Sequence, residues 1–365
     1  MVKFPQYLEQ RHFKWFRSND SGTHSRSECQ KPVSQDIELV DFKCCRCWQK
    51  RLSNKWNARI LAQKLGVPVP ELYWHGTKEQ IDQIPFDTFP ECYVIKPTSA
   101  WSCIGVFVMV RGVNQFDGRR HTPESLRQEL KKIAQKYPKT AFLVEEMVQN
   151  EAGEHKIPID FKCHVFGGQL ESILAIRRRD GHSGWAAFYD RNWNHKGGSR
   201  ASDPTLHIAP YKAEVIPAPK CLNQLVEYAE KLGAFYGSFV RIDFYATPRG
   251  AVFGEFTPFP NAGHHYNNYA DSWLERWQRL DPELFNGSVG DGKVMLMGLR
   301  SIGLNRAMIN NANGTKKILS DRGKQTTKRR SIRGRQTTKK PTVSERKSIS
   351  DRRPTALENI SNSIH

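Results

Sequence analysis

The clearest alternation of apolar and polar positions in this chain lies between residues 239 and 257, and it predicts a hairpin of two strands. Apolar side chains mark a first strand over residues 239–244 and a second over residues 251–256. The segment Thr247-Pro248-Arg249-Gly250 between them consists of residues typical of a tight turn. Such a hairpin can place Asp243 and Glu255 side by side on neighbouring strands.

Helices and further strands are predicted upstream of this hairpin. Residues 54–65 repeat apolar positions at helical spacing, with Ser53 or Asn54 as the N-cap and Gly66 at the end. Two more helices are expected over residues 123–137 and 220–232. Strands are expected over residues 72–74, 93–96, 106–110 and 141–148, and a longer hairpin over residues 157–176 with its turn at Gly167-Gly168. Residues 1–50 show no pattern that we can assign.

Lys96 ends an apolar strand and precedes a loop of small residues that contains Ser99, Ser102 and Gly105. A lysine at the end of such a strand is costly to bury without an anion. Backbone N–H groups of a small-residue loop can contact a phosphate, which would supply that anion. No helix follows the loop, so it differs from a Walker loop. A polar hairpin tip without any ligand is the alternative interpretation.

Acidic residues end the strand predicted over residues 141–148. Glu145 and Glu146 follow four apolar residues, which suggests that this segment leaves the core and reaches an edge. On the next predicted strand, Asp160 and Lys162 are two positions apart and therefore point to the same face.

Two acids buried side by side in the late hairpin would repel each other and raise each other's pKa. A cation between them would remove this conflict. A hard divalent ion such as Mg²⁺, held by Asp243, Glu255 and the phosphates of a nucleotide, would satisfy both carboxylates. A solvated hairpin with both acids on its wet face is the alternative.

Length and cysteine usage narrow the class of protein. The 365 residues can form two domains or one large domain. No apolar run long enough for a membrane span and no secretory signal can be recognised, so we expect an intracellular, cytoplasmic protein. The eight cysteines are sparse, as in proteins of reducing compartments. A zinc site could be imagined at Cys29, Cys44, Cys45 and Cys47, but a second metal knuckle is missing, so free thiols are the default.

The net charge of +19 is concentrated in the C-terminal tail. Residues 311–365 contain 15 Lys or Arg and 4 Asp or Glu, which gives +11 in this segment. The tail contains no Phe, Trp or Tyr, so it cannot bury much apolar surface, and we expect it to be disordered. It could contact polyanions such as nucleic acid through charge alone. A solvated extension without a specific partner is the alternative.

Taken in order, a series of motifs in this chain resembles the ATP-grasp superfamily. The motifs are Lys55 opening a helix, Lys96 before its loop, the segment 143–148, Asp160-Phe161-Lys162 before the Gly-Gly turn, and Arg241-Ile242-Asp243 followed by Glu255-Phe256-Thr257. The last two most resemble the TupA-like branch, named for a teichuronopeptide-biosynthesis protein. The resemblance covers about residues 50–286 and implies an ATP-grasp fold, in which two α+β subdomains clasp ATP. We expect one subdomain over residues 51–140 and the other, with the metal site, over residues 141–300.

The resemblance also implies roles for individual residues. Lys55 and Lys96 would bind phosphates, covered by the loop of Ser99, Ser102 and Gly105. The adenine would meet Glu145 and the backbone of Glu146, Met147 and Val148, and the ribose would meet Glu151 or Glu154. Asp243 and Glu255 would hold Mg²⁺, and Arg241 would steady the transferred phosphoryl group, with Lys162 as a second catalytic residue.

Two positions depart from the pattern of the family. Thr257 stands where many relatives carry an Asn, and its hydroxyl could bind the metal directly or through water. Lys162 stands where many relatives carry Arg, which keeps the charge and loses the bidentate fork. His264 and His265 could contact substrate or act as a base, or could simply pack in a turn.

The activity that this resemblance implies is ATP-dependent ligation of a carboxylate to an amine through an acyl-phosphate. Relatives of this branch are associated with cell-surface polymer biosynthesis, which points to an acidic polysaccharide or a peptide polymer as acceptor. Two alternatives stay open. The chain could be an ATP-grasp kinase or an inactive ATP-binding protein, or it could be a basic nucleic-acid-binding protein that acts through its tail.

Overall fold

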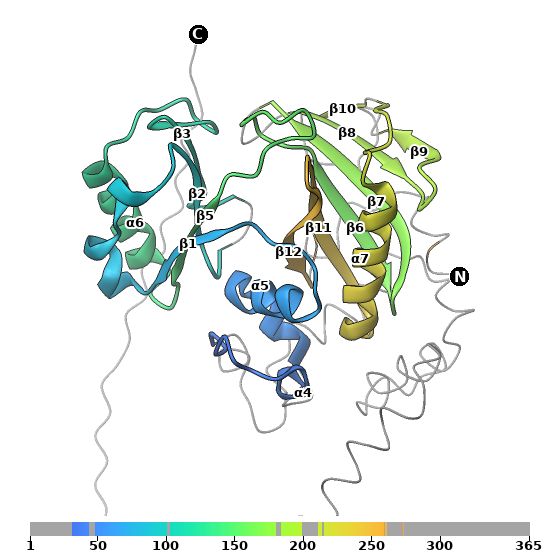
Figure 1. The fold of residues 1–365 in the computed structure, drawn as a ribbon, viewed down its shortest axis with the longest axis horizontal. Helices are drawn as coiled ribbons and strands as arrows, with labels where there is room; N and C mark the ends of the chain where they lie inside the picture. The colour runs from blue at the N-terminus through green and yellow to red at the C-terminus, as the bar shows by residue number, and fades with distance from the viewer. Residues whose placement is uncertain are drawn as a thin grey trace, which may run out of the picture. The chain divides into compact units, whose positions relative to one another are not determined.

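The computed structural model describes residues 31–43, 48–100, 103–179, 184–198, 211–213, 215–258, 260 and 273. These residues form two β-sheets with helices packed against them, so the fold class is α+β, as predicted (Figure 1). Several predicted features lie outside the described residues, namely those at Ser102, at Cys29, Cys44, Cys45 and Cys47, at His264 and His265, and in residues 311–365. In the described part of the chain, no helix is both long and apolar enough to cross a membrane.

The first sheet has the strand order β1-β5-β2-β3-β4, and all neighbours in it are antiparallel. Its strands are β1 (Leu72–Gly76), β2 (Cys92–Pro97), β3 (Phe107–Val110), β4 (Val113–Asn114) and β5 (Phe142–Glu146). The accompanying helices are α6 (Pro123–Lys136) and the short 3-10 helices η3 (Lys78–Gln83) and η4 (Phe86–Thr88). Leu126, Leu130 and Ala134 recur every four residues and bury one face of α6 in the core of this sheet.

The second sheet has the order β10-β8-β7-β6-β11-β12, with β9 paired to β8. Its strands are β6 (Asp160–Phe166), β7 (Gln169–Arg178), β8 (Gly184–Tyr189), β9 (His195–Gly198), β10 (Tyr211–Ala213), β11 (Phe239–Thr247) and β12 (Gly250–Thr257). All pairs are antiparallel except β10 with β8. Helix α7 (Leu222–Tyr236) runs along β6, β7, β11 and β12, as Figure 1 shows.

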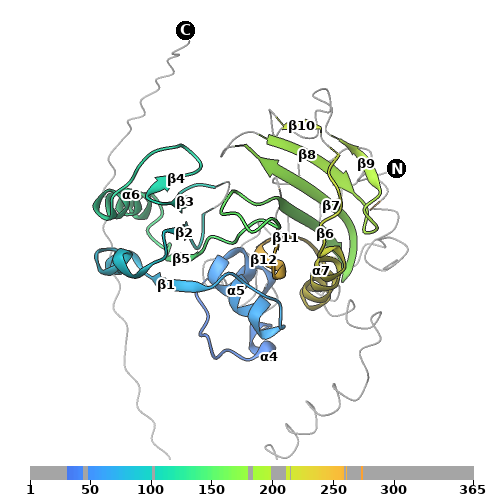
Figure 2. The same ribbon diagram turned by 45° about the horizontal axis from the view of Figure 1, so that its top comes forward.

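The N-terminal helices belong to the core of the second sheet. Helix α5 (Lys55–Lys64) packs beside β12, which can be followed in Figure 2. The short helices α4 (Leu39–Phe42) and η2 (Trp48–Ser53) precede it, and their Phe42 and Trp48 are buried in the same core. The previously unassigned segment before residue 50 therefore contributes apolar side chains to this core.

The predictions that rest on local sequence, namely the ends of one helix and two hairpin turns, are confirmed. Asn54 caps α5, because its side-chain oxygen accepts a hydrogen bond from the Trp56 N–H at 2.9 Å. Gly66 has a φ of +69° directly after the helix, a conformation that glycine adopts without strain. The hairpin turn at Gly167 and Gly168 and the late hairpin of β11 and β12 also form as predicted.

The prediction that residues 141–148 reach an edge is wrong. Strand β5 lies between β1 and β2, and Glu145 is only 4% exposed. The carboxylate is tolerated there because two cations from other elements contact it, which the local sequence does not reveal. Strand β5 joins the first sheet, whereas α5 joins the core of the second.

Candidate functional site

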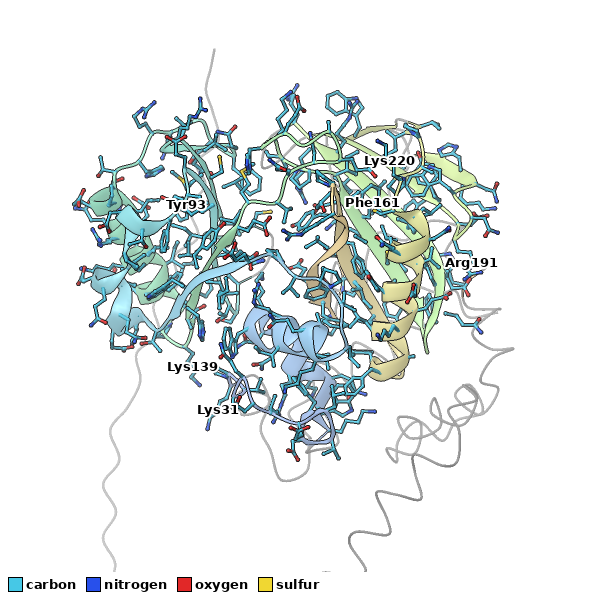
Figure 3. All side chains as sticks on the ribbon, viewed as in Figure 1. Lys31, Tyr93, Lys139, Phe161, Arg191 and Lys220 are labelled. Carbon is cyan, nitrogen blue, oxygen red and sulfur yellow. The ribbon has the colours of Figure 1, made fainter. Side chains whose placement is uncertain are left out.

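One cavity collects most of the charged residues that the sequence singled out. Its wall is formed by α5, the β2–β3 hairpin, the end of β5 with the loop that follows, and strands β6, β7, β11 and β12. Tyr93 of β2 and Phe161 of β6, labelled in Figure 3, mark the two sheets that contribute. The volume is about 150 Å³, roughly ten times what one buried water needs. Its charged lining residues are Lys55, Lys96, Glu145, Glu146, Asp160, Lys162, Arg178, Asp243 and Glu255.

Asp243 and Glu255 face each other across the late hairpin. They are directly opposed in the register of β11 and β12, and both line the cavity. The register shifts next to this pair, which leaves Gly254 as the extra residue of a β-bulge. A Cβ atom on Gly254 would lie 3.1 Å from the Asp243 carbonyl oxygen, so glycine allows the strands to approach here. The bulge thus turns both Gly254 and Glu255 toward the cavity.

Cations and carboxylates alternate in one continuous row from β7 to α5. The row holds four cations and three carboxylates, and a net positive row suits an anionic ligand. The successive contacts are Arg178 Nε to Asp160 Oδ2 at 3.0 Å, Asp160 Oδ2 to Lys162 Nζ at 3.4 Å, Lys162 Nζ to Asp243 Oδ2 at 2.5 Å, Asp243 Oδ1 to Arg241 Nε at 2.7 Å, Arg241 Nη2 to Glu255 Oε1 at 3.5 Å, and Glu255 Oε2 to Lys55 Nζ at 3.4 Å.

Burial and the neighbouring charges act on these carboxyl groups in opposite directions. Burial raises the pKa of Glu255, but the cations Lys55, Arg241 and Lys162 outweigh burial and the repulsion from Asp243, so the net pKa is lowered. Burial likewise raises the pKa of Asp160, and Lys162 and Arg178 more than offset it. Both groups are therefore ionised at neutral pH.

A second charge cluster surrounds Glu145. Its carboxylate contacts Lys96 Nζ at 2.5 Å and Arg59 Nη1 at 3.3 Å. All three side chains are nearly buried, so the charges compensate one another inside the protein. Lys55 lies close by and anchors the loop after β2, because its Nζ donates to the Ala100 carbonyl at 2.7 Å.

The cavity also has an apolar part. Val94, Val108, Met147 and Ile157 contribute to its wall. Tyr245 lies on the same wall, and burial followed by several nearby carboxylates raises the pKa of its hydroxyl well above the usual value. The tyrosine therefore stays neutral at any physiological pH.

The loop after β2 borders the cavity with residues other than those predicted. Ser99 is exposed and lies off the cavity wall, whereas Ala100 and Cys103 line it. Gly105 takes a φ of +72°, and a Cβ atom there would lie 2.9 Å from Ile133 Cδ1. Glycine at this position is thus explained by backbone conformation and close packing.

The acids expected near a ribose lie away from the cavity. Glu154 is exposed and bonds to Asn150 at 3.0 Å and to Lys156 at 2.8 Å. Glu151 accepts a hydrogen bond of 2.7 Å from the backbone N–H of Lys220, whose position Figure 3 labels. Both side chains are used to fix local surface structure.

Thr257 also lies off the cavity wall, with its hydroxyl turned to Arg241. The Arg241 Nη2 donates to Thr257 Oγ1 at 2.8 Å. Arg178 and Tyr245 line the cavity and were given no site role in the sequence interpretation. A signal for Tyr245 was available, because it stands two residues after Asp243 on a strand and so shares its face. Arg178 could not be found this way, since it comes from another hairpin.

The donor set around the opposed carboxylates suits a hard cation that brings other ligands with it. Within the residues that the structure describes, no three His, Cys, Asp or Glu side chains come close enough together to hold a metal ion. Asp243 and Glu255 supply carboxylate oxygens from one side only. Mg²⁺ commonly binds to one or two carboxylates and completes its shell with phosphate oxygens and water, so this pair fits Mg²⁺ bound to a phosphorylated ligand.

Several solved ligases are similar to this chain. The D-alanine–D-alanine ligase from Bacillus anthracis has 17% identity and a TM-score of 0.40, with 65% of this chain and 71% of that chain covered. The VanG D-Ala:D-Ser ligase from Enterococcus faecalis has 16% identity and a TM-score of 0.42, with 63% of each chain covered. The D-alanine-D-alanine ligase from Coxiella burnetii has 13% identity and a TM-score of 0.40, with 76% of this chain and 64% of that chain covered. No curated protein matches this chain significantly.

The family assignment rests on a family match rather than on these distant similarities. The model of the TupA-like ATP-grasp family matches residues 47–277. This range contains both sheets and every residue named above on the cavity wall. Because the match spans more than half of the 365 residues, the chain belongs to the TupA-like ATP-grasp family, and the predicted ATP-grasp fold is confirmed.

Proposed function

We propose that this protein is an ATP- and Mg²⁺-dependent ligase that joins a carboxylate to an amine through an acyl-phosphate. The single observation that carries the proposal is the opposed pair Asp243 and Glu255 on a cavity with Lys55, Lys96 and Lys162. Carboxylates for a metal and lysines for phosphates are the parts that phosphoryl transfer from a nucleotide requires. Membership of the ATP-grasp family supports ATP as that nucleotide.

The apolar part of the cavity is the proposed site for the adenine base. Met147 and Val148 follow directly after β5 and line the cavity, and their backbone would face the base edge. Tyr245 offers a neutral aromatic ring that can pack on a purine. Glu145 acts here mainly by holding Lys96 and Arg59.

The charged part is the proposed site for the phosphates and the metal. Asp243 and Glu255 would hold Mg²⁺, which neutralises charge on the phosphate oxygens when it is bound. Lys96 and Lys55 would neutralise the remaining phosphate charge. Lys162 contacts Asp243 in this structure and would also reach phosphate oxygens. Thr257 would support the site through its hydrogen bond with Arg241.

The reaction has two steps in this proposal. A carboxylate oxygen of the acceptor attacks the γ-phosphorus of ATP, the bond to ADP breaks, and an acyl-phosphate forms. An amine then attacks the acyl carbon, releases inorganic phosphate and loses a proton, which leaves an amide. Arg241 does not line the cavity itself but donates two hydrogen bonds to Asp243, and from there it would stabilise the negative charge on the transferred group.

The acceptor is proposed to belong to an acidic polysaccharide or a peptide polymer of the cell surface. The support is the family to which the chain belongs, because the described pocket residues do not select one carboxylate over another. The need for ATP and the free thiols at Cys92, Cys163 and Cys221 are compatible with work in the cytoplasm.

A trapping assay tests the proposed reaction. The protein is incubated with γ-labelled ATP, Mg²⁺, a panel of acidic polysaccharides and peptides, and hydroxylamine as a small surrogate for the amine. A ligase should release ADP and phosphate and convert one acceptor into a hydroxamate, and Asp243→Asn or Glu255→Gln should abolish both products. Label that stays on the acceptor in the presence of hydroxylamine would identify a kinase instead, and release of AMP would contradict the mechanism.

A further inference from the structure

An arginine at the tip of the late hairpin reaches the end of β5 in the other sheet. Arg249 Nη1 donates to Glu146 Oε1 at 2.9 Å, and Arg249 Nη2 donates to Glu146 Oε2 at 2.6 Å. This is the two-bonded fork geometry that arginine makes with a carboxylate. The two residues are 103 positions apart in the sequence, so the contact joins distant parts of the fold.

The arginine stands on a fixed turn. Thr247 Oγ1 donates to the Gly250 carbonyl at 2.8 Å, which closes the turn around Arg249. Gln224 of α7 accepts a hydrogen bond from the Ala251 N–H at 3.3 Å and ties the turn to the helix. The hairpin that carries this turn is also the one that carries Asp243 and Glu255.

The carboxylate on the other side is equally well held. The Glu71 N–H donates to Glu146 Oε2 at 2.9 Å, and the Glu146 N–H donates to the Glu71 carbonyl at 2.8 Å. Glu146 lines the cavity between Glu145 and Met147. Its side chain thus connects the proposed adenine wall with the hairpin that holds the opposed carboxylates.

A second connection runs beside the ion pair. The Phe253 N–H of β12 donates to the Pro68 carbonyl at 2.8 Å, in the short segment that leads to Glu71. Pro68 and Pro70 restrict the backbone of that segment, and Pro70 lines the cavity. The late hairpin is therefore joined to the first sheet and the segment before it by two contacts, namely this backbone hydrogen bond and the Arg249–Glu146 ion pair.

We propose that Arg249 and Glu146 form a positioning pair that holds the metal hairpin and the adenine wall at the separation that one ATP molecule requires. The inference rests on the proposed function, since it assigns the two ends of ATP to these two walls. Glu146 lines the cavity, whereas Arg249 lies off its wall, so Arg249 would act on the nucleotide only through the distance between the two walls. Its effect is therefore on ligands that span both walls.

This role separates clearly from a role in folding. The Arg249 side chain is 49% exposed, and exposed ion pairs contribute little to folding stability. Replacing Arg249 with Gln should leave the melting temperature nearly unchanged. MgATP should bind about tenfold more weakly, because its base and its phosphates can no longer contact both walls at the same time. Adenosine and magnesium tripolyphosphate each lack one end of ATP, so the affinity for either fragment should fall less than the affinity for MgATP.

The chain offers a matched control. Arg191 Nη2 contacts both carboxylate oxygens of Glu230, at 3.0 and 3.2 Å, and its side chain is 44% exposed. Neither residue lines the cavity, and Figure 3 labels Arg191 on the far side of the second sheet from the first. Arg191→Gln removes a similar ion pair and should change none of the three affinities.

The experiment measures the Kd of MgATP, adenosine and magnesium tripolyphosphate for the wild type, Arg249→Gln, Arg191→Gln and the charge exchange Glu146→Arg with Arg249→Glu. The positioning role predicts that Arg249→Gln loses more affinity for MgATP than for either fragment, and that the exchanged protein recovers part of the MgATP affinity. Unchanged MgATP affinity in Arg249→Gln, or an equal loss for adenosine, would overturn it. A wild type that binds no MgATP would refute the proposed function itself, which distinguishes the two failures.

Discussion

His164 should make this protein sensitive to mild acid. It lies on β6 in the register position opposite Arg241 and is 3% exposed. Its Nδ1 is 3.1 Å from Ser172 Oγ, and its ring stacks on Trp273 with 5.0 Å between the centroids. Burial, and after it the positive charges of Arg241 and Lys162, lower the pKa of His164 to about 3.

The magnitude follows from the difference between the folded and unfolded states. An unfolded histidine titrates near pH 6.5, so the unfolded chain takes up a proton that the folded chain refuses. The contribution of His164 to stability is therefore full above pH 6.5 and is lost as the pH falls toward 3. Between pH 7 and pH 5 the loss is about 2 kcal/mol, and this value hardly depends on the folded pKa as long as that pKa stays below 4.

The assay is urea unfolding of the wild type and of His164→Asn at pH 7 and pH 5. The amide of Asn can still bond to Ser172 but does not titrate. The free energy of unfolding of the wild type should fall by about 2 kcal/mol relative to the variant between these two pH values. The exposed His195 provides the control, since His195→Asn should keep the acid sensitivity of the wild type. Equal pH dependence of the wild type and His164→Asn would refute the reasoning.

Two further predictions follow from packing and from the cavity wall. Gly168→Ala should lower the free energy of unfolding by about 2–4 kcal/mol, because Gly168 has a φ of +94° and a new Cβ would lie 2.9 Å from Ala234 Cβ. Gly167→Ala, which has a φ of +56° and no atom within 4 Å of its new Cβ, should cost only the backbone strain of about 1–2 kcal/mol; equal costs from urea unfolding would contradict this account. Cys103 lines the cavity, and burial raises the pKa of its thiol, so it should be alkylated slowly and be protected by MgATP. Mass spectrometry of the labelled protein checks this, with Cys92, which lies off that cavity, as the internal control; protection of both thiols to the same degree would argue against a nucleotide in the cavity.

The parts of the site that the sequence predicts are those built from neighbouring residues. The pairing of Asp243 with Glu255 follows from one hairpin with a short turn, and the shared face of Asp160 and Lys162 follows from the two-residue period of a strand. The capped helix that begins at Lys55 is local in the same way. Local patterns thus place the individual groups on their elements.

Contacts between distant segments could not be predicted in this way. Glu145 is buried because Arg59 and Lys96 approach it from α5 and β2. The local sequence, which shows only an acidic residue at a strand end, therefore does not predict its burial. The bulge at Gly254 depends on the strand opposite to it. The roles expected for Glu151 and Glu154 came from the family resemblance. In the structure Glu154 bonds to Asn150, and Glu151 accepts a hydrogen bond from the backbone N–H of Lys220.

The central claim is that Asp243 and Glu255 together hold a divalent ion on the phosphates of ATP. Electron paramagnetic resonance of Mn²⁺, used in place of Mg²⁺, tests it most directly. The account predicts that the wild type binds Mn²⁺ strongly only when ATP is present, and that Asp243→Asn and Glu255→Gln each lose this binding while still binding adenosine. An unchanged Mn²⁺ signal with ATP in either variant would contradict the claim.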